Sequence, residues 1–373
     1  SRFGYSVASA GDVNGDGYSD VLVGADLFDA GQVNEGMVWF YKGGPTGLSL
    51  SASWTFQSNQ DNAQVGYSVA GIGDVNGDGF GDVALAAPWY DNGANDTGRI
   101  YVVYGTAAGL PATPSWTYDG TQADARVGRS AARAGDVNGD GFADLLVGVP
   151  YEDDGQFDEG VVHLFAGSAS GLGAAPAWSV ASNQASSAFG WCVAGAGDIN
   201  GDGYPEIIIG APLFDNDQVN EGRAFVYYGS GSGLVTSNAW TAESDQASGR
   251  MGWSVASAGD VNGDGYADVI VGAPYFDNGQ TNEGRAFVFL GSPVGTVTAP
   301  VWMAESNVAS ALFGSTVAAA GDVNGDGYDE IAVGAPNFKY GQTQVGRVTA
   351  YYGSPAGPST AASWTYESNS ANA

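Results

Sequence analysis

The chain has one cysteine, few basic residues and no long apolar run. Because Cys192 is the only cysteine among 373 residues, no intrachain disulfide can form. No stretch stays apolar over the ~20 residues that a transmembrane helix needs, and none has the form of a signal peptide. The 11 Lys and Arg residues stand against 41 acids, so the formal net charge is −30. A surface of that charge repels nucleic acid and anionic membranes, so both are poor partners, and we expect no nucleic-acid binding and no direct membrane insertion.

Helical periodicity and catalytic patterns are also missing. With 60 glycines and few Lys, Glu or Leu residues at helical spacing, the chain offers no amphipathic helix. It has no Ser-His-Asp pattern, no glycine-rich phosphate loop and no zinc ligand cluster. The candidate bases are His163, Lys42 and Lys339, and none of them recurs along the chain. We therefore expect no enzyme, no catalytic residue and no organic cofactor.

What the chain does contain is one unit written six times. The stretch from Asp12 to Asp20, DVNGDGYSD, is followed by further copies, each starting 62 residues after the previous one. These copies start at Asp74, Asp136, Asp198, Asp260 and Asp322. A fixed period of this size indicates a repeat architecture. We expect a single domain over residues 1–373, with repeats at 1–62, 63–124, 125–186, 187–248, 249–310 and 311–373.

The repeated stretch has the spacing of a loop that wraps oxygen donors around a hard cation. Acidic and amide side chains stand at positions one, three, five and nine, and the backbone carbonyl at position seven completes the set. EF-hand and dockerin loops share this sequence pattern, but they need an acid at position twelve and a helix on either side. Here position twelve is apolar in every copy, as Val23 is in the first, so the loop joins two strands.

We expect Ca²⁺ in all six loops, because the donors are numerous, all oxygen and carried on a flexible loop. Without a cation, three carboxylates in one loop would repel one another. The alternative is that DG and NG are ordinary turns with surface acids. Glu206 and Glu330 replace Asp at position nine, so these two sites should differ in affinity. The predicted ligands are Asp12, Asn14, Asp16, Tyr18, Asp20; Asp74, Asn76, Asp78, Phe80, Asp82; Asp136, Asn138, Asp140, Phe142, Asp144; Asp198, Asn200, Asp202, Tyr204, Glu206; Asp260, Asn262, Asp264, Tyr266, Asp268; and Asp322, Asn324, Asp326, Tyr328, Glu330.

Each repeat predicts four short strands, which in the first copy cover residues 5–10, 20–25, 37–41 and 53–56. The second and third are nearly continuous apolar runs, so both of their faces should be buried. One sheet with two apolar faces is not stable alone, but six such sheets packed face to face around an axis are. The predicted fold class is therefore all-β: a β-propeller of six four-stranded blades of 62 residues each.

A tryptophan recurs in the fourth predicted strand of every copy. An aromatic residue repeated at one structural position favours packing between blades over a ligand platform. These residues are Trp54, Trp116, Trp178, Trp240, Trp302 and Trp364.

Two short signatures open and close the first strand pair of several copies. Phe-Gly stands at Phe3-Gly4, Phe189-Gly190 and Phe313-Gly314, and Gly-Ala-Pro at Gly210-Ala211-Pro212, Gly272-Ala273-Pro274 and Gly334-Ala335-Pro336; the remaining copies are degenerate. With these signatures the whole chain resembles FG-GAP repeat proteins, the units of the integrin α-subunit propeller, here in a bacterial integrin-like form. The resemblance implies calcium in the hairpins between strands one and two and partner binding on the opposite face. An extracellular or cell-surface location is expected because weak calcium sites of this kind fill only where calcium is abundant, outside the cell.

The chain departs from the integrin pattern in its number of repeats. Integrin propellers have seven blades and borrow a strand from the N-terminus, whereas six complete units are present here. Residue 373 is in phase with residue 1, so we expect a six-bladed ring with adjacent termini; a missing seventh unit is the alternative. Since the first residue already lies within a repeat, we expect a fragment of a longer exported protein.

A second repeated set of polar residues lies between the second and third strands, on the rim opposite the ions. Such a set is typical of a site for sugar hydroxyls or a basic peptide, but we favour residues that cap the backbone of their own turns. The set is Asp29, Asn34, Glu35; Asp91, Asn95, Asp96; Asp153, Asp158, Glu159; Asp215, Asn220, Glu221; and Asp277, Asn282, Glu283, and copy six breaks it with Lys339, Gln344 and Val345. The arginines that follow this loop are expected to pair with its acids; they are Arg99, Arg223, Arg285 and Arg347.

Two classes of function fit these patterns. We favour a non-catalytic, calcium-stabilised interaction or adhesion module, a monomer that binds a protein or glycan on its upper face; a carbohydrate-binding lectin is the main alternative. A polysaccharide lyase is less favoured, because it needs a base beside an acidic sugar. Six divalent ions would add twelve positive charges and leave the chain at −18, which would still repel a uronic-acid polymer.

Overall fold

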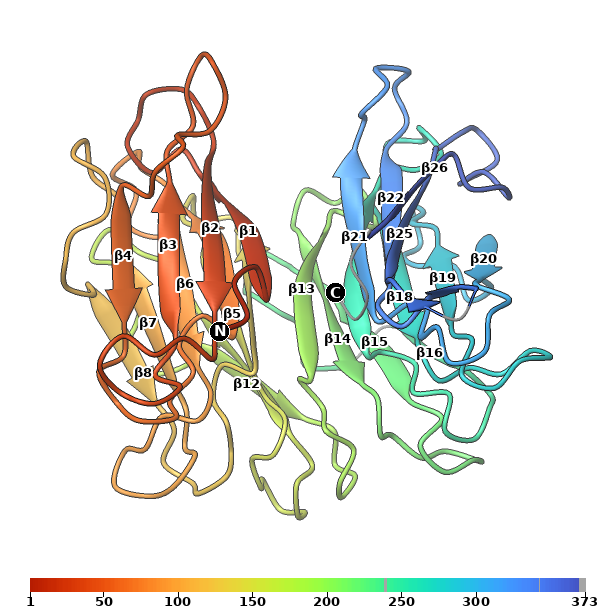
Figure 1. Ribbon diagram of the computed structural model, residues 1–373, viewed down its shortest axis with the longest axis horizontal. Helices are drawn as coiled ribbons and strands as arrows, with labels where there is room; N and C mark the ends of the chain where they lie inside the picture. Colours follow the sequence, from red (N-terminus) through yellow and green to blue (C-terminus); the bar gives the residue numbers. More distant parts are fainter. Residues whose placement is uncertain (238–239, 342, 369–373) are drawn as a thin grey trace. The chain divides into compact units, whose positions relative to one another are not determined.

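The computed structural model describes residues 1–237, 240–341 and 343–368 as an all-β chain of six four-stranded antiparallel blades. The predicted fold class, a β-propeller with six such blades, is confirmed. The chain forms two compact units, Ser1–Gly190 and Trp191–Ala373, with three blades in each. Figure 1 shows the four strands of the first blade lying side by side. Over the described ranges there is no helix, and so none with the length and apolarity needed to cross a membrane.

The first unit contains blades one to three, and each blade takes its four strands in chain order. Blade one is β1 (Ser6–Gly11), β2 (Asp20–Ala25), β3 (Met37–Tyr41) and β4 (Trp54–Gln57). Blade two is β5 (Ser68–Gly73), β6 (Asp82–Ala87), β7 (Arg99–Val103) and β8 (Trp116–Asp119). Blade three is β9 (Ser130–Gly135), β10 (Asp144–Val149), β11 (Val161–Phe165) and β12 (Trp178–Ala181).

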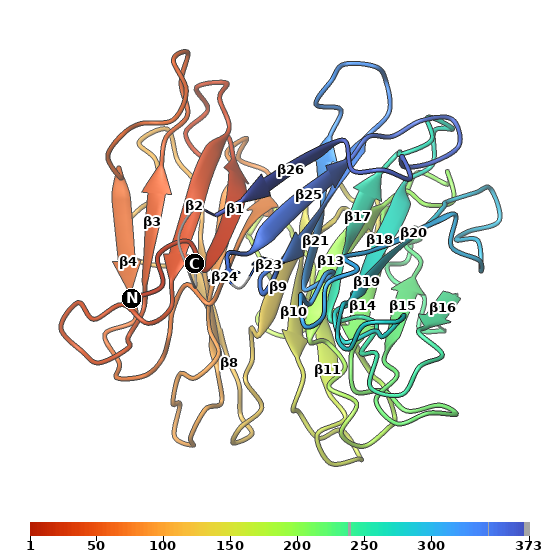
Figure 2. The same cartoon turned by 45° about the vertical axis from the view of Figure 1, so that its right-hand side comes forward.

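The second unit contains blades four to six in the same order, with one added hairpin in the last blade (Figure 2). Blade four is β13 (Cys192–Gly197), β14 (Glu206–Ala211), β15 (Arg223–Tyr227) and β16 (Trp240–Glu243). Blade five is β17 (Ser254–Gly259), β18 (Asp268–Ala273), β19 (Arg285–Phe289) and β20 (Trp302–Glu305). Blade six is β21 (Thr316–Gly321), β22 (Glu330–Ala335), β25 (Arg347–Tyr351) and β26 (Trp364–Glu367), with the hairpin β23 (Lys339–Tyr340) and β24 (Thr343–Gln344) between β22 and β25.

The predicted strand positions hold closely in the first blade. The second and third strands have the expected bounds, while the first and fourth each start and end one residue later than predicted. The first strand extends to Gly11 because a bulge after Ser9 lets Gly11 pair with Asp20. The fourth ends at Gln57 because that residue pairs with Met37, the first residue of β3.

The hydrophobic core of each unit lies between neighbouring blades. The second strands β6, β10, β14 and β18 are buried at every position, as expected for strands covered on both faces. The first strands of successive blades pack on one another, β1 on β5 and β5 on β9 in one unit, β13 on β17 and β17 on β21 in the other. Side chains such as Phe40, Leu85 and Val103 therefore fill the space between two sheets, which neither sheet could fill alone.

Four of the six recurring tryptophans join neighbouring blades, as predicted. The indole Nε1 of Trp54 donates to the carbonyl of Pro111 in the next blade, at 3.0 Å, and that of Trp302 donates to Ser359 at 2.9 Å. Trp116 and Trp240 make the same bond to Gly173 and Val297. An indole packed against the next blade needs such an acceptor for its N–H, so these four tryptophans are structural, whereas Trp364 is 51% exposed.

Candidate metal loops and the opposite rim

The six DxNGDG loops connect the first and second strands of their blades, at one end of each sheet. In the first loop, Asp12 Oδ1 accepts the Asp16 amide at 3.0 Å and its Oδ2 accepts the Gly17 amide at 2.7 Å. Asn14 Oδ1 also accepts the Asp16 amide, and Asp16 Oδ1 accepts the Tyr18 amide. Loops two to six repeat these bonds. The side-chain oxygens at positions one, three and five, which are the predicted metal ligands, therefore all point into the turn that the loop backbone forms.

The acid at position nine begins the second strand and is fully buried in all six blades. Asp20 Oδ2 accepts the Val13 amide at 3.1 Å, and its Oδ1 accepts the amide of Gly43, which follows β3, at 2.7 Å. The Asp residues of blades two, three and five make the same two bonds. Each oxygen keeps a second lone pair, so this carboxylate ties two loops together and can still coordinate a cation.

Burial makes this acid costly to ionise. Desolvation raises the pKa of Asp82 and Asp268 to about 7, that of Asp144 to about 6 and that of Glu206 to about 8. In each case the two aspartates at positions five and one of the same loop raise the pKa further, while backbone amides lower it. A cation within the loop would offset both effects, because it favours the ionised carboxylate.

The carboxylates meet most closely in the last loop. One oxygen from each of Asp322, Asp326 and Glu330 lies within 4.8 Å of the other two, and among the described residues the other five loops bring their three acids less close together. In the sixth loop the Asn324 side-chain amide donates to Glu330 at 3.2 Å. In loops two to five the equivalent Asn donates to the Asp at position five.

The donor set fits a calcium ion. Each loop of nine residues has carboxylates at positions one, five and nine and an amide oxygen at position three, and it has no basic residue. In blade four, Glu206 Oε1 is buried, and although the Gly229 amide lies near it, no donor of the described chain meets it in hydrogen-bonding geometry. An unmatched buried carboxylate oxygen is costly unless a cation accompanies it.

Sequence reasoning missed the role of the side chain at position seven. A Cβ atom on Gly15, in the first loop, would lie 2.8 Å from the ring of Phe80, in the second. Phe142, Tyr266 and Tyr328 lie equally close to Gly77, Gly201 and Gly263, so each ring covers the loop of the preceding blade. The signal was present in the sequence, since position seven is aromatic in all six copies.

Backbone hydrogen bonds connect the same neighbouring loops. The amide at position eight donates to the carbonyl of position one in the preceding blade: Gly81 to Asp12 at 2.8 Å and Ala267 to Asp198 at 2.9 Å, for example. In blade six the Asp329 carboxylate also accepts the Asp260 amide of blade five at 2.8 Å. Within each unit the metal loops therefore form a continuous contact series.

The polar residues of the opposite rim cap their own loops, as we favoured. Asp29 Oδ1 accepts the Asn34 amide at 2.6 Å, and Oε1 of the fully buried Glu35 accepts the amides of Ala30 and Gln32. The equivalent aspartates of blades two to five accept the same amide, and the glutamates of blades three to five are buried caps as well.

The predicted set was displaced by one residue in the second copy. Asp96, whose amide donates to Asp91, takes the place of Asn34, and Thr97 takes the place of Glu35. The loop of this blade has an Asn at 95 that suggested the wrong alignment. Thr97 Oγ1 donates to the Tyr90 carbonyl at 3.1 Å. A hydroxyl therefore holds this loop, whereas a glutamate carboxylate holds the equivalent loop in blades one, three, four and five.

The expected pairing of four arginines with the loop acids was wrong. Each arginine pairs with the last residue of the fourth strand in its own blade, because the two residues are cross-strand neighbours in the sheet. Each guanidinium also stacks on an aromatic ring of the preceding loop, as Arg99 does on Tyr90 at 4.0 Å. The pairs are Arg99–Asp119, Arg223–Glu243, Arg285–Glu305 and Arg347–Glu367.

The three candidate bases lie in different blades. His163 is buried in β11, where Nδ1 lies 2.8 Å from Ser179 Oγ and Nε2 lies 3.3 Å from Glu152, and its ring contacts Tyr118 of blade two. Lys42 follows β3 in blade one, and Lys339 belongs to the hairpin of blade six.

Comparison with known proteins agrees with this architecture. A family model for the FG-GAP repeat matches residues 3–41, 65–103, 127–165, 189–227, 251–289 and 313–351. The chain is 32% identical over 238 residues to integrin alpha-5 of Xenopus laevis, covering 61% of this chain and 21% of that protein. It is 34% identical over 222 residues to integrin alpha-V of Gallus gallus, covering 57% and 20%. The matched region is thus about a fifth of the length of these relatives. With six matched repeats in six blades, the chain belongs to the FG-GAP repeat family.

Proposed function

We propose that this chain is a calcium-stabilised, non-catalytic interaction module of an extracellular or cell-surface protein. The observation that carries the proposal is the set of six loops, each with three carboxylates and an amide oxygen around one backbone curl. In this proposal a bound ion supplies positive charge to the buried acid at position nine. The resemblance to integrin α chains supports a role in adhesion. The three candidate catalytic bases lie in three separate blades, which gives no support to a lyase.

The partner is proposed to bind the rim formed by the loops between second and third strands. Buried acids such as Glu35 and Glu159 hold these loops in fixed shapes, and fixed loops lose little conformational entropy on binding. A glycan array and a pull-down from surface proteins, each with calcium and with chelator, test this role. Capture that needs calcium supports the proposal, and capture that is equally strong in chelator contradicts it.

The number of bound ions is the first quantitative prediction. Native mass spectrometry in millimolar calcium should show up to six ions for each chain. Asp16→Ala should remove one of them, because the substitution deletes the acid at position five of the first loop and leaves the other five loops intact. A chain that binds no ion under these conditions would refute the proposal.

A second prediction concerns communication between neighbouring loops. Tyr266 provides only its backbone carbonyl to its own predicted site, but its ring covers Gly201 in the loop of blade four. Tyr266→Ala should therefore speed amide hydrogen exchange in residues 198–206, whereas Tyr266→Phe, which keeps the ring, should not. An exchange increase confined to residues 260–268 would show that the neighbouring loops are independent.

A further inference from the structure

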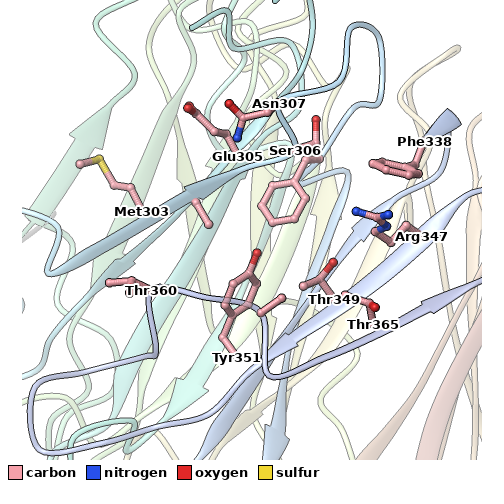
Figure 3. A pocket seen from close by; sticks show the side chains of 13 residues that line it. Met303, Glu305, Ser306, Asn307, Phe338, Arg347, Thr349, Tyr351, Thr360 and Thr365 are labelled. Atoms are coloured by element: carbon pink, nitrogen blue, oxygen red, sulfur yellow. The ribbon is translucent and has the colours of Figure 1, made fainter. Parts of the chain in front are cut away.

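A polar pocket of about 380 Å³ lies between blades five and six, within the second unit (Figure 3). β20 of blade five provides one wall, with Met303, Ala304 and Glu305, and β25 of blade six provides the other, with Thr349 and Tyr351. The volume is in the range of small-molecule sites, ~300–1,000 Å³. In Figure 3, Thr349 and Tyr351 lie near the centre, with Glu305 and Asn307 at one end and Thr360 at the other.

The pocket exists because two side chains are small where other copies have rings. In the first unit the equivalents of Ala304 and Thr349 are Phe56 and Tyr101, whose ring centroids are 4.9 Å apart. The next pair of blades fills the same space with Tyr118 and His163, 5.8 Å apart. Position 349 has a ring in every other copy, namely Trp39, Tyr101, His163, Phe225 and Phe287. The first unit therefore closes this space with rings, and only blade six lacks the ring at position 349.

The walls of the pocket offer hydrogen-bonding groups without partners. Thr349 and Tyr351 are 4% and 6% exposed, and among the described residues their hydroxyls make no hydrogen bond. Neither hydroxyl oxygen is among the buried atoms that lack a partner, so both reach the surface of the pocket, where a ligand can bond them. The equivalent space between blades four and five, about 460 Å³, has Phe287 and Phe289 at these two positions. Of these two spaces, the one between blades five and six has hydroxyls at both positions, on Thr349 and Tyr351, and the other has rings without hydroxyls.

The charges at the pocket are already paired. Glu305 accepts two hydrogen bonds from Arg285 and others from the Asn278 amide, and Arg347 pairs with Glu367. A charged ligand would have to compete with these ion pairs, and an anion would also approach a chain of net charge −30. A neutral ligand with several hydroxyls is the best match, since it can bond the free groups and pack its C–H faces on Met303 and the Tyr351 ring.

We propose that the pocket between β20 and β25 binds the terminal pyranose of a neutral glycan. The pyranose hydroxyls exchange hydrogen bonds with Thr349, Tyr351 and Asn307, while its ring occupies the space that Phe56 and Tyr101 fill in the first unit. The site is separate from the six metal loops and does not depend on how many of them bind calcium.

Saturation-transfer difference NMR with methyl glycosides of neutral hexoses and N-acetylhexosamines, in calcium buffer, tests this site. At least one glycoside should bind the full chain, and Tyr351→Phe should weaken its binding about tenfold, because one hydrogen bond to the ligand is lost. The double variant Ala304→Phe/Thr349→Tyr copies the pair found in the first unit and should abolish binding. Ala242→Phe, which fills the neighbouring space, should leave binding unchanged. Far-ultraviolet circular dichroism and thermal unfolding check that each variant is folded.

Three results would overturn the proposal. The first is that no neutral glycoside binds the unaltered chain. The second is that the filled double variant binds as strongly as the unaltered chain. The third is that methyl glycosides of uronic or sialic acids bind more strongly than the neutral ones, which would assign the pocket to an acidic ligand.

Discussion

Removal of calcium with EGTA should lower the melting temperature of this chain by many degrees. Without ions, the buried acid at position nine, such as Asp82, faces two further carboxylates of its own loop. A site held at a hundred times its dissociation constant adds ~2.7 kcal/mol to stability. Three such sites in one unit would rival the whole stability of a typical domain, about 5 to 15 kcal/mol. Differential scanning calorimetry with and without EGTA measures the effect.

Variants separate the contribution of one loop from that of all six. Asp16→Ala should cost only a small part of the stabilisation and should loosen mainly the first blade. Vacating only the loops of Glu206 and Glu330 should cost less than full chelation. A melting temperature that is the same with calcium and with EGTA would show that the loops are ordinary turns with surface acids.

Gly98→Ala should destabilise the first unit by about 4 kcal/mol, which lowers its melting temperature by roughly 8 to 16 °C. Gly98 immediately precedes β7, has a φ of +82° and pairs with Val127 at the start of the next blade. A Cβ atom there would lie 2.3 Å from the Val127 nitrogen and 2.5 Å from its carbonyl oxygen. The substitution therefore combines backbone strain with a displacement of the neighbouring blade.

Gly93→Ala in the same loop is the matched control. Gly93 has a similar φ of +80°, but a Cβ atom there would meet nothing within 4 Å. Gly93→Ala should lower the free energy of unfolding by about 1 kcal/mol, because the only cost is the strain of an alanine in the left-handed conformation. Chemical unfolding followed by tryptophan fluorescence compares the two. If both variants lose the same free energy of unfolding, the contact with Val127 contributes nothing to the effect of Gly98→Ala.

The sequence by itself determined the features that lie within one repeat. The period of 62 residues gave the number of blades, and the apolar runs located β2 and β3 to the residue. Turn residues such as Asp29 could also be interpreted correctly, because their hydrogen-bond partners lie five residues away. Local spacing encodes contacts of this kind directly, since short connections leave the backbone few alternatives.

Only the tertiary structure decided the contacts between repeats and between distant strands. Arg99 meets Asp119 instead of the nearer loop acids because strand register places those two residues opposite one another. Phe80 covers Gly15, and Ala304 and Thr349 leave a pocket, because neighbouring blades bring together residues that are separated by dozens of positions. The sequence shows that an aromatic or a small residue recurs. Which space that residue fills or leaves open depends on how two sheets pack face to face. The spacing of residues within one repeat does not determine that packing.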